Sequence, residues 1–174
     1  LDYNDTAFIL QGETYRTGYH PSEVIPSILA LGEREKSSGK DVITSINVAY
    51  DLSIAFLESV IGQGLEKKGW NGDTRGAYIM PLVLGKMIGL SAEQMANAVG
   101  IVGSCHAVFG ILDTPAEEYT MTKNIRFPTM AYGSILGILL AQKGFTGPLG
   151  MIEGHDGFVE TIMNGDFDVN KLLE

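Results

Sequence analysis

The 174-residue sequence predicts an all-α fold of about six helices, several of them buried on nearly every side. Three observations lead to this prediction. Apolar residues recur at helical spacing over long segments, while no segment shows a convincing alternation of apolar and polar residues. Glycine and alanine also recur every four residues in apolar segments, a spacing that lets helices approach closely.

The first half of the chain is expected to hold two helices. Residues 1–20 are polar and are interpreted as a loop with at most one short helical turn. A helix is expected from Ser22 to about Lys36, with Pro26 in or near its first turn, where proline is tolerated. The clearest helix follows, because steps of three and four separate a stripe of apolar residues: Ile43, Ile46, Tyr50, Ile54, Leu57 and Ile61.

Two further helices are expected in the middle of the chain. Residues 65–73 form a polar, glycine-rich segment around Trp70, and a helix with a kink at Pro81 is expected from Thr74 to Ile88. The next helix starts after Ser91, an N-cap candidate, and Gln94 stands at the capping-box position.

The last long helix is expected from about Lys123 to about Lys143, after a loop over residues 110–120. A bend at Pro128 is expected near its start. Small residues recur along it at Gly133, Gly137 and Ala141, which predicts close contact with a neighbouring helix. One short helix is expected in the tail.

The charge and the cysteine count exclude several classes of protein. Twelve Lys and Arg against 21 Asp and Glu give a net charge of −9, which argues against binding nucleic acid or an anionic membrane surface. No apolar run is long enough for a transmembrane helix. Cys105 is the only cysteine, so an intrachain disulfide is impossible; a reducing compartment, the cytoplasm, is expected.

Metal and thiol chemistry have little support in the sequence. The three histidines at positions 20, 106 and 155 share no helical spacing and lie near no cysteine pair, so no metal site is expected. Cys105 and His106 are neighbours in sequence, but a nucleophile and its base must meet in space. A buried thiol in a helix of small residues is the favoured interpretation.

Three polar stretches remain as candidates for a site: "LDYNDT" (1–6), "GYHPSE" (18–23) and "YTMTKNIRFP" (119–128). In the third, Lys123 and Arg126 stand near two threonine hydroxyls, a combination suited to gripping a carboxylate. The alternative is that both are solvated charges in the first turn of a helix. His20 could likewise be a surface ring or a ring that caps a helix.

Five blocks, taken in order, resemble the 2-methylcitrate dehydratase family (MmgE/PrpD). They are "LDYNDT", "HPSEVIPSILALGE", "GLSAEQMANAVGI", "TKNIRFPTMAYGSILGILLAQKGFTGP" and "EGHDGF". The resemblance covers nearly the whole chain, and the His-Pro-Ser and Gly-Phe-Thr-Gly-Pro blocks are specific in combination. In this family an all-helical domain carries most of the active site, and a smaller α/β domain closes over it.

The resemblance implies a domain and a set of site residues. Residues 1–174 are expected to be the middle and end of the helical domain, without its first helices and without the second domain; the chain begins with Leu1 rather than Met. By position His20, Asp2 and Lys123 match catalytic residues of the family, and Thr6 matches a residue of its site. Arg126 is a weaker candidate for binding a substrate carboxylate.

The implied activity is that of a hydro-lyase on a small di- or tricarboxylate such as 2-methylcitrate, without metal or organic cofactor and as a homodimer. A decarboxylase or epimerase acting on a related acid such as cis-aconitate is the alternative within enzymes. One departure favours a third possibility, an inactive helical interaction module. Many family members carry a second histidine after the Gly-Trp or Gly-Phe of the loop, where this chain has Asn71, Gly72 and Asp73.

Overall fold

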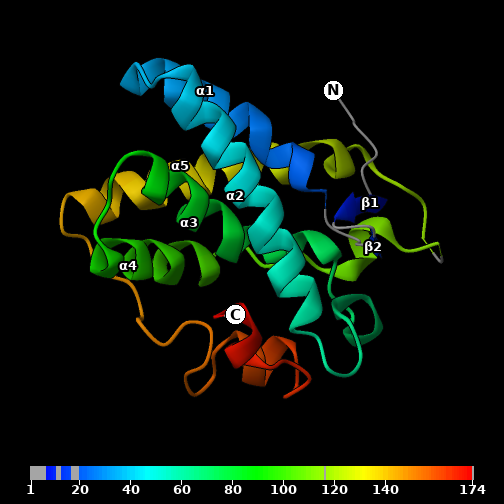
Figure 1. The fold of residues 1–174 in the computed structure, drawn as a ribbon. Coiled ribbons are helices and arrows are strands. Elements are labelled where there is room, and N and C mark those ends of the chain that lie inside the picture. Colours follow the sequence, from blue (N-terminus) through cyan, green and yellow to red (C-terminus); the bar gives the residue numbers. More distant parts are fainter. Residues whose placement is uncertain (1–6, 11–12, 17–19, 116, 174) are drawn as a thin grey trace.

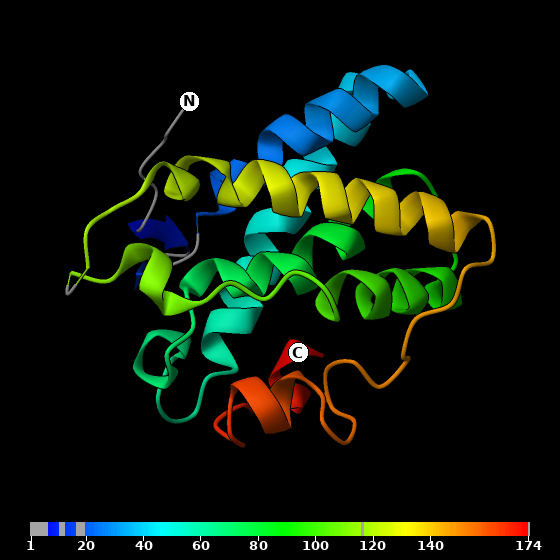
Figure 2. The ribbon, with the colours of Figure 1, turned by 180° about the vertical axis from the view of Figure 1, so that it is seen from behind.

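The fold is all-α, as predicted, and Figures 1 and 2 show it from opposite sides. The computed structural model describes residues 7–10, 13–16, 20–115 and 117–173. Within these ranges the long helices are α1 (Ile25–Glu35), α2 (Gly39–Glu58), α3 (Gly76–Met87), α4 (Ala92–Gly103) and α5 (Arg126–Gln142). No helix among the described residues is both long and apolar enough to cross a membrane.

The N-terminal segment differs from its prediction as a loop. Strands β1 (Ala7–Leu10) and β2 (Glu13–Arg16) pair antiparallel, with Phe8 opposite Tyr15. Each strand has only four residues, too few for a period of two to stand out from chance. The hairpin is the only sheet among the described residues, so it does not alter the fold class.

Helix α3 is the centre of the fold and is buried on nearly every side. It packs against α2, α4 and α5, which surround it in Figure 1. Its apolar residues Tyr78, Ile79, Met80 and Leu84 have no exposed surface. Burial on all sides explains why its sequence lacks a polar face. Pro81 lies inside α3, as expected.

The small residues of α5 admit the neighbouring helix α4, as the spacing predicted. A Cβ atom on Gly137 would stand 2.5 Å from Cγ2 of Val102 in α4, and one on Gly133 would collide with the ring of His106. Burial of that ring lowers the pKa of His106, so it packs as a neutral side chain. Pro128 lies in the first turn of α5, where no backbone hydrogen bond is lost.

The end of helix α4 corrects the expectation for the single cysteine. Helix α4 begins with the predicted capping box, in which the Ser91 hydroxyl accepts from Gln94 N–H. It ends at Gly103, so Cys105 lies in the turn beyond the helix and is exposed rather than buried.

The C-terminal segment covers the end of the helical body opposite α1. It crosses α4 at Gly100, where a Cβ atom would stand 2.5 Å from the Pro148 carbonyl oxygen. A π-helix over Phe158–Ile162 and a 3-10 helix over Val169–Leu172 follow. The ring of Phe158 lies 4.6 Å, centroid to centroid, from that of Tyr78, which anchors the segment to α3.

Candidate active site

The site is built where two loops are joined by backbone hydrogen bonds. Asn71 N–H donates to the Val108 carbonyl at 2.8 Å, and Gly110 N–H donates to the Gly69 carbonyl at 2.8 Å. The Thr74 hydroxyl also donates to the Val108 carbonyl at 3.0 Å. These bonds bring the 3-10 helix Gly72–Arg75 (η3) beside the segment that leads to the 3-10 helix Gly110–Asp113 (η4).

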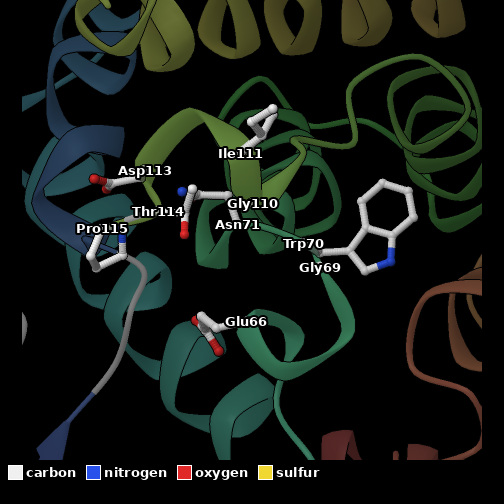
Figure 3. A pocket seen from close by; sticks show the side chains of 9 residues that line it. All are labelled: Glu66, Gly69, Trp70, Asn71, Gly110, Ile111, Asp113, Thr114 and Pro115. Carbon is white, nitrogen blue, oxygen red and sulfur yellow. The ribbon is translucent and has the colours of Figure 1, made fainter. Parts of the chain in front are cut away.

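A cavity of about 330 Å³ lies between these loops. Figure 3 shows its lining side chains, with Asp113, Thr114 and Pro115 on one side and Trp70 on the other. The Trp70 ring stacks on Phe109 with centroids 5.0 Å apart, which stiffens that wall. Two lining residues are acidic, Glu66 and Asp113, and none of the described lining residues is a lysine or an arginine.

Lys123 contacts the cavity wall through Asp113, although it does not line the cavity itself. It lies in the 3-10 helix Met121–Ile125 (η5) just before α5. Its Nζ atom contacts Oδ1 of Asp113 at 2.5 Å and stands 4.2 Å above the centre of the Tyr119 ring. The side chains of Lys123 and Asp113 are 31% and 28% exposed, so water reaches the pair.

Asp73 and Arg126 form a second ion pair, and this one is buried. The Arg126 guanidinium contacts the Asp73 carboxylate, and their side chains are 10% and 1% exposed. Asn71 holds the turn, because its side-chain oxygen accepts from Asp73 N–H at 2.9 Å. Burial raises the pKa of the Asp73 carboxyl to about 6; Arg126 and then His20 lower it in part, and Asp113 raises it.

His20 stands directly before a helical turn, and this turn fixes the position of its backbone. Its carbonyl accepts from Glu23 N–H at 3.0 Å, and Pro21 opens the 3-10 helix Pro21–Val24 (η1). His20 is partly buried and lowers the pKa of Asp73, so it lies within electrostatic reach of that carboxylate. Asp2 and Thr6, the other expected site residues, lie outside the described residues.

A model of the MmgE/PrpD N-terminal domain matches residues 1–170 of the chain. The chain belongs to the MmgE/PrpD family. Two cis-aconitate decarboxylase sequences of Aspergillus terreus, one of them from strain NIH 2624 / FGSC A1156, are 30% identical to it over 152 residues. The match covers 83% of this chain and 30% of each relative, so the chain spans about 30% of the length of these relatives.

Three residues of this candidate site cannot be picked out from the sequence alone. Asp73 and Asp113 stand in loops that the sequence marks only as polar, and no local pattern separates them from solvated aspartates. In the sequence Asn71 stands out only because it replaces an expected histidine, yet its side chain caps the η3 turn that carries Asp73. Each becomes visible only once residues distant in the sequence are brought together.

One group of potential metal ligands occurs among the described residues, and it lies elsewhere. Ligand atoms of His155, Asp156 and Glu160 lie within 4.8 Å of one another, and all three residues are exposed. Glu160 already accepts from Asp156 N–H at 2.8 Å and contacts the His155 ring at 2.9 Å. None of these residues lines the cavity between the loops.

Proposed function

We propose that this chain carries part of the active site of a lyase that removes a proton from a carbon next to a carboxylate of a small acid. Membership of the MmgE/PrpD family supports this proposal. The observation that carries it is a pair of linked charges: Lys123 pairs with Asp113, which lines the cavity, and Arg126 pairs with Asp73, whose pKa His20 also lowers. His20 directly precedes η1, Lys123 lies in η5 and Arg126 opens α5.

In this proposal His20 is the base, because its ordinary pKa lies near neutral pH and its backbone is held at the start of η1. Lys123 binds the substrate carboxylate and stabilises the negative charge that develops when the carbon loses its proton. Asp2 is assigned to orienting His20 or binding a substrate hydroxyl, and Thr6 to donating a hydrogen bond.

The favoured reaction is dehydration. His20 takes the proton from the carbon next to the carboxylate, a carbon–carbon double bond forms, and the hydroxyl on the adjacent carbon leaves with a proton as water. Decarboxylation is the second candidate, because the relatives that match are named cis-aconitate decarboxylase. There the bond to a carboxylate breaks, carbon dioxide leaves and the carbon takes up a proton.

The test is to incubate the full-length protein with a panel of acids that includes 2-methylcitrate, citrate, cis-aconitate and hydroxy acids with one carboxylate. Unsaturated products without gas release are expected, and carbon dioxide would instead assign decarboxylation. His20→Gln should lower kcat/KM at least about a hundredfold, as expected for loss of a general base. Failure of every acid to react would leave a helical interaction module as the better explanation.

A further inference from the structure

We propose that Asn71 binds the substrate directly, by donating a hydrogen bond from its side-chain amide nitrogen to a carboxylate oxygen in the cavity. This inference rests on the proposed function and adds a residue to its site. It follows from the place of Asn71 in the cavity wall, from the orientation of its amide group and from the contrast with a second buried asparagine.

Asn71 is buried and is at the same time part of the cavity wall. The residue is 8% exposed, and it lines the cavity between the two loops (Figure 3). Its backbone is fixed, because Asn71 N–H donates to the Val108 carbonyl at 2.8 Å. A polar group held in place in the wall of a cavity is the kind of group that orients a ligand.

The orientation of the amide follows from its hydrogen bond to the η3 turn. The side-chain oxygen, Oδ1, accepts from Asp73 N–H at 2.9 Å. A backbone N–H can only donate, so the oxygen and not the nitrogen must face it. The amide nitrogen, Nδ2, therefore points away from this turn, and it makes no hydrogen bond to any described residue. Its two N–H donors are left for a group in the cavity.

A second buried asparagine shows how this side chain is usually satisfied. Asn97 is 9% exposed, and it uses both ends of its amide within the fold. Its Nδ2 donates to the Glu93 carbonyl at 2.9 Å, and its Oδ1 accepts from Gly147 N–H at 3.0 Å. Buried polar atoms are nearly always paired in this way, and an unpaired donor is unfavourable until a partner arrives. Asn97 does not line the cavity, whereas Asn71 does.

The wall beside Asn71 can accept a carboxylate. Of the two acidic lining residues, Asp113 is paired with Lys123 at 2.5 Å, and Glu66 is exposed to water, which screens its charge. An amide gives a carboxylate a hydrogen bond but transfers no proton. Proton transfer therefore stays with His20 in the proposed reaction, although many family members carry a histidine in the loop that holds Asn71.

Two substitutions separate the roles of the two amide atoms. Serine caps a helical turn about as well as asparagine, so Asn71→Ser keeps an acceptor for Asp73 N–H and removes the donor. Asn71→Asp also keeps the acceptor and replaces the donor by a charged oxygen. Calorimetry with tricarballylate, an unreactive tricarboxylate, measures the affinity of the full-length protein. Asn71→Ser should weaken binding by roughly tenfold, and Asn71→Asp by at least as much. The urea midpoint of Asn71→Ser should stay near that of the wild type.

Asn97→Ser is the matched control, because Asn97 is buried to the same extent and lies outside the cavity. The opposite pattern is expected for it. Loss of the bonds to Glu93 and Gly147 should lower the urea midpoint, while the affinity of the folded protein for tricarballylate should not change.

The outcomes separate the inference from the proposed function. Asn71→Ser protein that binds tricarballylate as tightly as the wild type would overturn the inference. If its urea midpoint also fell, Nδ2 would be assigned a partner within the full-length protein instead. Wild-type protein that does not bind tricarballylate would overturn the inference as well. Turnover of a panel acid alongside any of these results would keep the lyase assignment while rejecting the role of Asn71. A tenfold loss of affinity in a protein that turns over no acid would keep Asn71 as a ligand and reject the lyase.

Discussion

The carboxylate of Asp73 and the guanidinium of Arg126 meet in the interior, although one belongs to η3 and the other opens α5. Arg can bind a carboxylate at two points, but burial works against the charge on Asp73. Burial outweighs the attraction of Arg126, because the pKa of Asp73 is raised to about 6 from an ordinary value of 3.8. The pair therefore fixes the position of Arg126 beside Asp73 and is not a large source of stability.

The raised pKa of Asp73 predicts how stability depends on pH. The fold favours the protonated carboxyl, so the contribution of Asp73 is fully present below about pH 4 and is lost as pH rises through about 6. The loss should not exceed about 3 kcal/mol. Asp73→Asn, which is neutral at every pH, should match the wild type in acid and become the more stable protein at alkaline pH. Urea unfolding across this range measures the difference, and equal pH profiles would contradict the assignment.

Replacement of Lys123 should damage the reaction far more than replacement of another paired lysine. Lys123→Ala removes the cation beside Asp113, and kcat/KM for the true substrate should fall by roughly a hundredfold or more. Lys68→Ala removes a lysine that contacts Asp166 at the same distance, but Asp166, unlike Asp113, does not line the cavity, so this variant should retain near wild-type turnover per folded molecule. Arg126→Ala should cost less turnover than Lys123→Ala. A Lys123→Ala enzyme within about twofold of the wild type, or less than ~0.4 kcal/mol of barrier, would remove Lys123 from the site.

Gly137→Ala tests the contact between α4 and α5. The added methyl group would stand 2.5 Å from Cγ2 of Val102, inside a packed core. Overpacking should outweigh the better helix propensity of alanine and lower the free energy of unfolding by about 1–3 kcal/mol. Gly39→Ala in α2 is the control, because its Cβ atom would meet nothing within 4 Å, and its stability should be unchanged or slightly higher. Equal stabilities for the two variants would show that the helices can separate at no cost.

Chelation should leave the activity of the full-length protein unchanged. The potential metal ligands found among the described residues are exposed and lie outside the cavity, and the proposed chemistry uses a histidine base and a lysine. The measurement is turnover after prolonged dialysis against a strong chelator, compared with mock dialysis. Loss of turnover that one added ion restores would assign the reaction to a metal and overturn the proposed roles.

Much of the fold follows from local patterns in the sequence. The stripe from Ile43 to Ile61 predicted α2, which spans Gly39–Glu58, and Ser91 with Gln94 predicted the start of α4. The small residues of α5 predicted the close approach of α4. The prediction of a loop over residues 1–20 was wrong for the β1–β2 hairpin, because four-residue strands carry almost no periodic signal.

The sequence by itself determined the helices and the family. It also determined the polar segments that contain His20 and Lys123. These are properties of neighbouring residues, which propensity, capping and spacing encode directly. Only the tertiary structure decided that Asp113 neutralises Lys123 and that Asp73 is buried against Arg126. An ion pair between distant segments, and the pKa of a carboxyl within it, depend on burial and on the distance between charges. Burial and the distance between these charges are set only when the chain folds and the loops around Asn71 and Val108 are joined.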